Sequence, residues 1–313
     1  MTTCPPSLPA RNASHIEAGG RSAVSRREQS TDTPQQYIKG YTEFYKLRFK
    51  VTPDVLIPRP ETELLVDEVL RFIQNKDLRI KNKGFQSLIH NSKFLILDIG
   101  TGAGAIAISV AKNLNHHLPT LHLPTLGVGT RTIQIIATDV SAKALKIAKQ
   151  NAKLHGVEKQ ITFIQADLLN VIARSENDEA ISKTKQSLRS DDLRLPRPFG
   201  ARNDDNIDIL VTNLPYIPSY RIPYLDSSVK DFEPHVALDG GEDGFELYRK
   251  HFQQISDLAT QHRGLPPMLI IGEIDYTHGE LAVIEAQKYF PNSKAEVKTD
   301  LAHKQRILLI SID

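Results

Sequence analysis

The chain has 313 residues, of which 39 are Lys or Arg and 37 are Asp or Glu, so its formal net charge is only +2. This balance does not require a polyanionic partner, and the single cysteine, Cys4, excludes a disulfide framework or a cysteine metal cluster within one chain. No apolar run approaches the about 20 residues of a membrane span. We therefore expect a cytoplasmic protein that does not associate with membranes, and we expect a monomer.

The first 75 residues are predicted to form an arm and a cap. Residues 1–36 are rich in Pro, Ser, Arg, Gly and Gln without an apolar period. They are predicted to be disordered, because such a segment cannot repay the entropy of its ordering. Residues 37–75 are predicted to form a β-hairpin or cap, a proline-extended segment and a linker helix that ends near Ile73. Thr62 is the expected N-cap of that helix.

Residues 76–313 have the alternating pattern of an α/β domain. Strands are predicted at 94–99, 133–138, 161–165, 207–212, 268–271, 295–298 and 306–311, and helices at 103–114, 142–155, 244–262 and 279–289. The apolar runs have few polar interruptions, which indicates strands that are covered on both faces. The predicted fold is a seven-stranded mixed sheet with helices on both faces and a C-terminal antiparallel strand pair.

Three polar stretches interrupt this pattern at 74–92, 115–132 and 171–206. Each is longer than the about 4–6 residues of a usual connection, so each is predicted to be a surface insertion. His116, His117 and His122 have no carboxylate partner within their stretch, which favours a solvent-facing loop over a metal site.

A glycine-rich turn is expected where the first strand of the domain meets its helix. It contains Gly100, Thr101, Gly102, Ala103 and Gly104. At such a turn a ligand can approach backbone N–H groups closely. The turn also satisfies the dinucleotide pattern Gly-x-Gly-x-x-Ala, so by itself it does not separate a dehydrogenase from a methyltransferase.

Acidic residues follow the next two strands. Asp139 can accept hydrogen bonds from two ribose hydroxyls. Asp167 can accept a hydrogen bond from an adenine amino group while Leu168 packs on the ring, although Asp167 is equally suited to be an N-cap. With the glycine turn and Asn213, these residues follow four successive strands and predict one crevice.

The tetrapeptide Asn213-Leu214-Pro215-Tyr216 follows a buried apolar run and suits a planar NH₂ group. The side-chain oxygen of Asn213 and the carbonyl of Leu214 are two acceptors that can hold both N–H bonds and leave the nitrogen lone pair facing a methyl donor. Pro215 restricts the backbone, and Tyr216 offers a ring face. A sulfonium donor is already activated, so alignment and electrostatics suffice. The alternative is a strand that ends in a proline turn.

Four segments, at 55–63, 97–107, 213–218 and 233–244, carry a resemblance that spans roughly residues 41–312. The first contains Leu-Ile-Pro-Arg-Pro-Glu-Thr-Glu, which other amide and amine methyltransferases with an Asn-x-Pro-Tyr element match less well. Together the segments resemble the peptide chain release factor glutamine methyltransferases.

The resemblance implies a Rossmann-like class I methyltransferase fold and transfer of a methyl group from S-adenosyl-L-methionine to N5 of the glutamine in the Gly-Gly-Gln loop of release factors. It implies that the tetrapeptide binds that glutamine and is catalytic. Arg59 and Glu61 would line the substrate region, although an Arg59 paired with a surface acid is an alternative. The residues implied to contact the cofactor are Gly100, Thr101, Gly102, Ala103, Gly104, Asp139, Asp167, Leu168 and Asn213.

Two features depart from the family pattern. The family usually has proline where this chain has Leu214, which adds a backbone N–H, and Asn-Leu-Pro-Tyr is also familiar from rRNA adenine dimethyltransferases. Adenine-N6 methylation of RNA or DNA therefore stays an alternative. The family also normally has a helical N-terminal domain, whereas only about forty polar residues precede the resemblance. A binding module without turnover is thus a further alternative.

Overall fold

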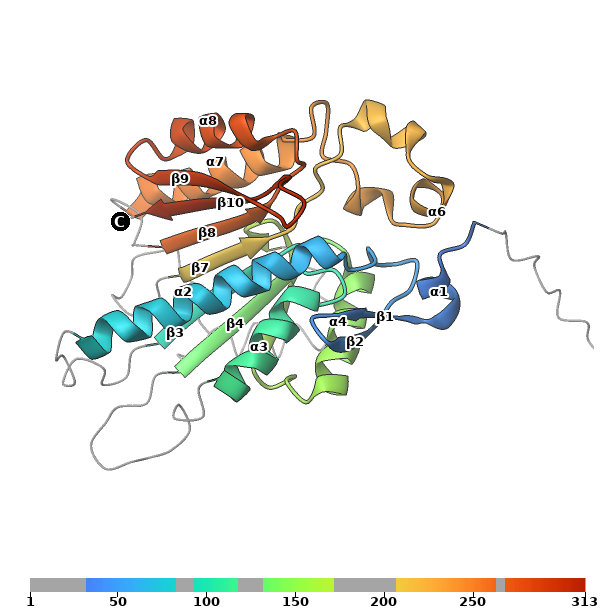
Figure 1. Cartoon of the computed structure of the whole chain (residues 1–313), viewed down its shortest axis with the longest axis horizontal. Helices are drawn as coiled ribbons and strands as arrows, with labels where there is room; N and C mark the ends of the chain where they lie inside the picture. The colour runs from blue at the N-terminus through green and yellow to red at the C-terminus, as the bar shows by residue number, and fades with distance from the viewer. Residues whose placement is uncertain (1–31, 83–92, 118–131, 172–206, 263–267, 313) are drawn as a thin grey trace, which may run out of the picture. The chain divides into compact units, whose positions relative to one another are not determined.

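The computed structural model describes residues 32–82, 93–117, 132–171, 207–262 and 268–312 (Figure 1). The predictions for residues 1–31, and for most of the three insertions, lie outside these ranges. The helices and helical turns are α1 (Gln35–Lys39), η1 (Pro60–Thr62), α2 (Glu63–Asn82), α3 (Ala105–His117), α4 (Ala142–His155), η4 (Ser219–Tyr224), α6 (Ser227–Lys230), η5 (His235–Ala237), α7 (Glu246–His262) and α8 (Gly279–Tyr289). The strands are β1 (Tyr41–Phe44), β2 (Leu47–Lys50), β3 (Lys93–Ile99), β4 (Thr132–Asp139), β5 (Ile161–Asp167), β6 (Asn170–Val171), β7 (Ile207–Thr212), β8 (Met268–Glu273), β9 (Lys294–Thr299) and β10 (Gln305–Ile312).

The main sheet has the order β6-β5-β4-β3-β7-β8-β10-β9. The strands from β5 to β8 are mutually parallel, and β10 is antiparallel to both β8 and β9. The predicted seven-stranded mixed sheet and closing antiparallel pair are thereby confirmed, and the two-residue strand β6 extends the edge beside β5. The chain leaves β3 first toward β4 and later returns to β7 on the other side, so the order of strands reverses beside β3.

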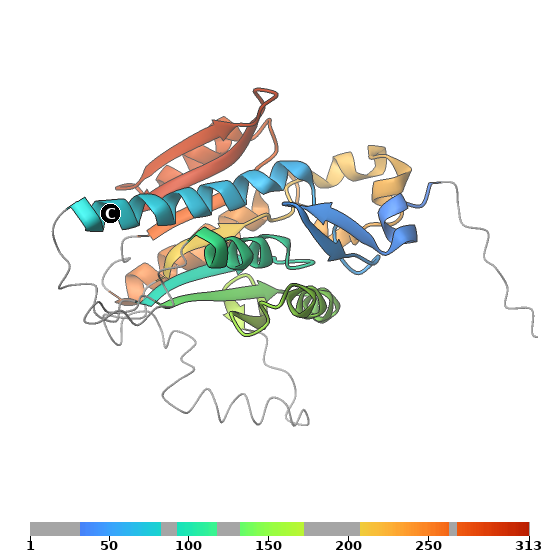
Figure 2. The same cartoon turned by 60° about the horizontal axis from the view of Figure 1, so that its bottom comes forward.

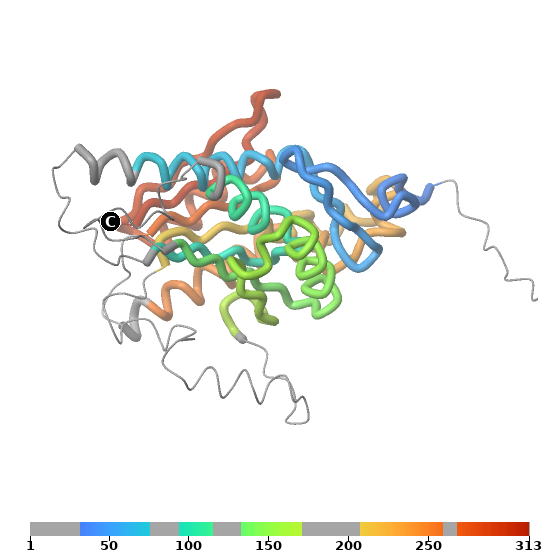
Figure 3. The backbone as a smooth tube through the Cα atoms, turned by 90° about the horizontal axis from the view of Figure 1, so that it is seen from below, coloured from blue at the N-terminus to red at the C-terminus, as the bar shows by residue number. Residues whose placement is uncertain are grey.

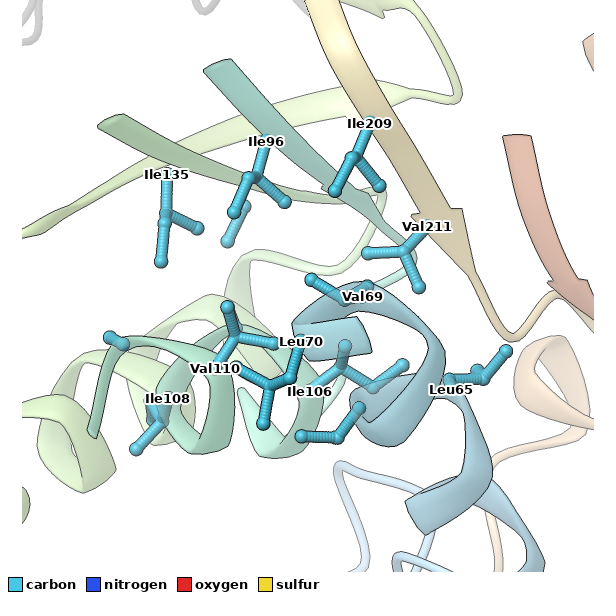
Figure 4. Packing of buried hydrophobic residues seen from close by; sticks show 14 of the residues in the cluster. Leu65, Val69, Leu70, Ile96, Ile106, Ile108, Val110, Ile135, Ile209 and Val211 are labelled. Carbon is cyan, nitrogen blue, oxygen red and sulfur yellow. The ribbon is translucent and has the colours of Figure 1, made fainter. Parts of the chain in front are cut away.

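Alternate residues of the strands serve two separate cores, as the period of a β-strand requires. On one face, Ile96 and Ile209 pack against α2 and α3, as Figure 4 shows for ten labelled side chains. On the other face, Leu97 and Leu210 pack with buried residues of α7 and α8. The central strands are apolar on both faces because both faces are covered.

The predicted hairpin is present as β1 and β2, and it lies beside the carboxyl ends of the parallel strands (Figure 2). Figure 3 shows that this side is away from the C-terminus. Asn151 of α4 holds this hairpin in place through hydrogen bonds. The Oδ1 of Asn151 accepts from the N–H of Lys50 at 2.8 Å, while its Nδ2 donates to the carbonyls of Lys50 and Ala103. The cap is thus joined to the glycine-rich turn through one buried amide.

Helix α2 begins directly after Thr62, as predicted, but it ends later than predicted. It continues to Asn82, past the expected end near Ile73 and across the expected domain boundary at 75/76. The polar stretch contains neither Gly nor Pro before residue 84, so loss of apolar character did not end the helix. At the other end, the hydroxyl of Thr62 donates to Glu273, so this side chain serves a tertiary contact.

Candidate active site

Five neighbouring parallel strands end at one edge of the sheet, beside the place where the strand order reverses. In such sheets, ligands bind outside the carboxyl ends of the strands at this switch point. The residues at or just after these ends are Gly100 after β3, Asp139 of β4, Asp167 of β5, Asn213 after β7 and Glu273 of β8. The four strand ends predicted to form a crevice therefore lie along one edge of the sheet, and β8 adds a fifth.

The glycine turn has two residues with space beside them. Gly100 has φ 71° and Gly102 has φ 56°, both in the left-handed region where a side chain is unfavourable. A Cβ atom on Gly102 would meet no described heavy atom within 4 Å, and one on Gly100 would lie 3.7 Å from Leu214 and 3.9 Å from the carbonyl oxygen of Asn213. The turn therefore leaves room for a ligand next to the tetrapeptide.

The other three residues of the turn face inward. The Thr101 hydroxyl donates to Asp98 at 2.6 Å, and the Ala103 side chain is buried. A Cβ on Gly104 would come within 2.7 Å of the Ile108 side chain and 3.2 Å of the Ala148 side chain. Gly104 thus allows α3 and α4 to pack closely, so contact between these three residues and a cofactor remains a prediction that involves their backbone alone.

Asp98 supports the turn from inside. Its Oδ2 accepts from Thr101 and from the backbone N–H of Ala107. Its Oδ1 is buried without a hydrogen-bond donor among the described residues. Burial raises the pKa of Asp98 to about 7, against the lowering effect of its two donors. This carboxyl consequently changes charge close to neutral pH.

Asp139 holds the open side of the turn. One carboxylate oxygen accepts from the N–H of Gly102 at 2.8 Å and the other from the N–H of Ser141 at 2.8 Å. Burial raises its pKa, although both backbone donors favour the charged form. A carboxylate oxygen accepts more than one hydrogen bond, so both oxygens keep capacity for the ribose hydroxyls that the sequence predicts.

Asp167 and Leu168 occupy the end of β5. An Asp167 oxygen lies 2.6 Å from Nζ of Lys250 on α7, so the carboxylate is engaged in an exposed ion pair. Leu168 has φ 56° and its side chain is buried. No α-helix begins at this point, because β6 follows directly, and the alternative of an N-cap at Asp167 does not apply.

The carboxamide of Asn213 is held from behind by two buried side chains. Its Nδ2 donates to Oγ1 of Thr62 and to Oε2 of Glu273, both at 3.0 Å. None of the described residues donates to Oδ1 of Asn213, and the residue is half-buried. The amide therefore presents an oxygen, an acceptor, on the side away from Thr62 and Glu273.

Leu214 supplies the second predicted acceptor. In the described part of the chain, its carbonyl receives no hydrogen bond. Its backbone N–H, which a proline would lack, interacts with the hydroxyl of the buried Tyr248 and acts to lower the pKa of that phenol, while burial raises it. The same hydroxyl donates to the carbonyl of Glu273. The backbone N–H of Leu214, which a proline at this position would lack, therefore has a partner in the Tyr248 hydroxyl.

The hydroxyl of Tyr216 donates a hydrogen bond to Oε1 of Glu273 at 3.0 Å. Burial and the neighbouring Glu273 charge raise the pKa of Tyr216 above its usual range, so the phenol stays protonated.

The segment at 239–244 packs closely against the backbone of Pro215 and Tyr216. A Cβ on Gly244 would lie 2.4 Å from the carbonyl oxygen of Tyr216, and one on Gly240 would lie 2.8 Å from that of Pro215.

The segment at 55–63 contributes two contacts. Arg59 forms an ion pair with Glu233, whose side chain is only 1% exposed, so the expected surface acid is in fact a buried residue of the segment at 233–244. Glu61 is exposed, and it faces the charges of Glu273 and Arg306. Contact of Arg59 and Glu61 with substrate stays a prediction.

Comparison with known sequences decides the family. A model described as a methyltransferase domain matches residues 90–188. A protein of Bacillus cereus named release factor glutamine methyltransferase is 30% identical over 280 residues, which cover 90% of this chain and 77% of the relative. A protein of the same name from Flavobacterium psychrophilum is 33% identical over 280 residues, with 89% and 75% covered. The chain belongs to the release factor glutamine methyltransferase family.

The fold agrees with this assignment. The solved hMettl16 catalytic domain in complex with MAT2A 3'UTR hairpin 6 aligns with a TM-score of 0.51 at 14% identity, and the alignment covers 86% of this chain and 77% of that one. At this identity the likeness shows the Rossmann-like methyltransferase fold alone. The chain is therefore a class I methyltransferase, and its methyl donor is S-adenosyl-L-methionine. Membership also removes the dehydrogenase interpretation of the glycine turn.

The residues at this edge of the sheet fit such a donor. No described side chain blocks the approach of a ligand to the backbone at Gly102, a Cβ on Gly100 would make only ordinary contacts, and Asp139 brings a carboxylate to the same turn. Within the described ranges, no helix combines the length and apolarity needed to cross a membrane, and no three His, Cys, Asp or Glu side chains are arranged to hold a metal ion.

Sequence reasoning left two residues of the site without a role. Glu273 is a lone acid after a strand, which carries no local signal of a role, and Thr62 was expected to cap a helix. The sequence did contain one indication of a role for Glu273, namely its position at the end of a strand. Glu273 ends a strand that neighbours β7, so it lies at the same sheet edge as Asn213.

Proposed function

We propose that this protein transfers a methyl group from S-adenosyl-L-methionine to the side-chain amide of the glutamine in the Gly-Gly-Gln loop of a peptide chain release factor. The observation that carries the proposal is a pair of acceptors, Oδ1 of Asn213 and the carbonyl of Leu214, to which no described residue donates, beside a glycine turn with open space. Family membership supports the same substrate.

The two acceptors match the chemistry of a primary amide. An amide nitrogen shares its lone pair with the carbonyl and is a poor nucleophile, so both N–H bonds must be held while the nitrogen faces the methyl group. Asn213 and Leu214 hold one proton each, Pro215 restricts the direction of the chain, and the Tyr216 ring lies beside them. S-adenosyl-L-methionine supplies an activated methyl group when it is bound, so the protein provides alignment and electrostatics.

None of the residues that the structure describes is placed as a strong base at the tetrapeptide. The Tyr216 phenol is kept protonated by burial and by Glu273, and Glu273 itself is screened from a ligand by the three side chains that donate to it. The residues therefore bind and orient the amide, and they exclude water from one side of it. This matches a displacement that depends on geometry.

The test is an incubation of the purified protein with S-adenosyl-L-methionine and three candidate substrates in parallel, namely a release factor, rRNA and DNA. We expect one added methyl group, located by peptide mass spectrometry on the Gly-Gly-Gln glutamine. A release factor in which this glutamine is replaced by asparagine is the matched control and should gain none. Methyl transfer to adenine, with none to the release factor, would overturn the proposal in favour of a nucleic-acid enzyme.

A further inference from the structure

The carboxylate of Glu273 collects donors from distant parts of the chain. Oε2 accepts from the Thr62 hydroxyl at 2.7 Å and from Nδ2 of Asn213 at 3.0 Å, and Oε1 accepts from the Tyr216 hydroxyl at 3.0 Å. Glu273 is 1% exposed. Burial of a carboxylate is costly unless its oxygens are hydrogen-bonded, so this arrangement needs all three partners.

The roles of donor and acceptor in this cluster follow from its chemistry. The Thr62 proton points at Glu273, which leaves the Thr62 oxygen to accept the second N–H of Asn213. Both protons of the Asn213 amide are therefore used. If the amide rotated by half a turn, its oxygen would face the Glu273 carboxylate, and two acceptors would oppose each other without a proton between them.

We propose that Glu273 and Thr62 are positioning residues that lock the Asn213 carboxamide with its oxygen toward the substrate and hold the Tyr216 phenol beside it. They act through Asn213 and Tyr216 and do not touch the reacting atoms. The identity of the substrate amide rests on the proposed function, but the locked orientation does not. A site locked in this way accepts an N–H donor and rejects an acceptor.

Selectivity follows from this lock. A glutamine NH₂ places a proton on Oδ1 of Asn213, whereas a glutamate carboxylate would place a negative oxygen against it. Glu273 lies directly behind the amide. Burial raises its pKa, whereas the hydrogen bonds from Thr62 and Tyr216 and the charge of Arg306 favour its ionised form. In that form it strengthens this discrimination, since Coulomb repulsion in a half-buried site exceeds that in water. Release factors with glutamate at the methylated position should therefore bind weakly as well as fail to react.

The first test uses Thr62→Val, which keeps the shape of the side chain and removes its hydroxyl. We expect kcat for methyl transfer to fall at least about tenfold, as expected for loss of one hydrogen bond that maintains the reactive geometry. The Kd of S-adenosylhomocysteine, measured by calorimetry, should stay within about twofold. Thr62→Ser restores the hydroxyl and should restore most of kcat.

The second test uses Glu273→Gln and Glu273→Leu. In Glu273→Gln, the amide oxygen can accept from Thr62 and Asn213 while the amide N–H donates to the Tyr216 oxygen, so we expect activity within about tenfold of the wild type. Glu273→Leu can make none of these bonds and should lose turnover as fully as removal of the Asn213 side chain. A purely structural role would instead lower stability and cofactor affinity in parallel with kcat.

The third test does not depend on methyl transfer. The side-chain NH₂ of Asn213, observed by ¹⁵N-edited NMR in the protein without substrate, should exchange with solvent far more slowly than the NH₂ of the exposed Asn292. Thr62→Val should accelerate the exchange at Asn213 and leave Asn292 unchanged.

The outcomes separate the two proposals. Equal exchange at Asn213 and Asn292 in the wild type, or a Thr62→Val variant with wild-type kcat, would overturn the lock even if release factor is methylated. Slow exchange at Asn213 without methylation of release factor would support the lock and reject the proposed substrate.

Discussion

Nδ2 of Asn213 lies 3.0 Å from Oε2 of Glu273, although 60 residues separate them in the chain. The two residues are neighbours because β7 and β8 are parallel and adjacent and both end at this edge of the sheet. The contact fixes which end of the Asn213 amide faces the crevice.

Replacement of Asn213 by alanine removes one of the two proposed acceptors for the substrate NH₂. We expect kcat to fall by about 10²–10³, the usual loss when one preorganised polar contact at a reacting group is removed. The Kd of S-adenosylhomocysteine should change much less. Single-turnover kinetics and calorimetry measure the two effects. Asn292→Ala, at an exposed position, is the control, and a turnover of Asn213→Ala close to that of the control would contradict the assigned role.

Replacement of Asp139 by alanine should have the opposite profile. It removes the acceptor for the N–H groups of Gly102 and Ser141 and the predicted ribose ligand. We expect the Kd of S-adenosylhomocysteine to rise at least about tenfold, while kcat at saturating donor falls less. Lys143→Ala, at an exposed position in the first turn of the following helix α4, serves as the comparison. Unchanged cofactor affinity in Asp139→Ala would remove this residue from the cofactor site.

Replacement of Gly244 by alanine should displace the tetrapeptide. Gly244 has φ 80°, and a Cβ there would lie 2.4 Å from the carbonyl oxygen of Tyr216. Gly156→Ala is a matched control, because Gly156 has φ 68° but its Cβ would meet nothing within 4 Å. The control should cost only the about 1–2 kcal/mol of a left-handed residue in urea unfolding. Gly244→Ala should cost more and also lose turnover. Equal effects in both variants would show that close packing at Gly244 does not matter.

Replacement of Asp98 by asparagine should change the pH dependence of stability. Burial raises the pKa of Asp98 from 3.8 to about 7 in the folded protein. The folded state therefore binds more protons than the unfolded state between these values, so this group stabilises the fold most at low pH and loses that contribution as pH rises toward about 7. The loss has a slope of up to about 1.4 kcal/mol per pH unit.

The asparagine variant lacks this contribution. Relative to the wild type, Asp98→Asn should therefore gain free energy of unfolding as pH rises from about 5 to about 7. Urea unfolding of both proteins at each pH measures the difference. A difference that stays constant over this interval would mean that Asp98 is ionised throughout, with its buried Oδ1 solvated in some other way.

Prediction from sequence was accurate where the signal is local. The runs that became β3, β4, β7 and β8 were placed within two residues of their observed ends, and the glycine turn and tetrapeptide were placed after the correct strands. It was less accurate for α2, because the helix continues to Asn82 through residues that are polar but still favour helix. Polarity alone did not distinguish an exposed helix from a loop.

The sequence alone determined the order of strands and helices along the chain, the conformational freedom at Gly100 and Gly102, and the presence of two oxygen acceptors in the tetrapeptide at residues 213 and 214, because each depends on neighbouring residues. The tertiary structure decided the direction in which the Asn213 amide points. That direction depends on Thr62, 151 residues away, and on Glu273, which meet Asn213 only after the parallel strands have aligned their ends. Side chains so far apart in the chain come within hydrogen-bonding distance only when the helices and strands pack together. No local sequence pattern predicts such a contact.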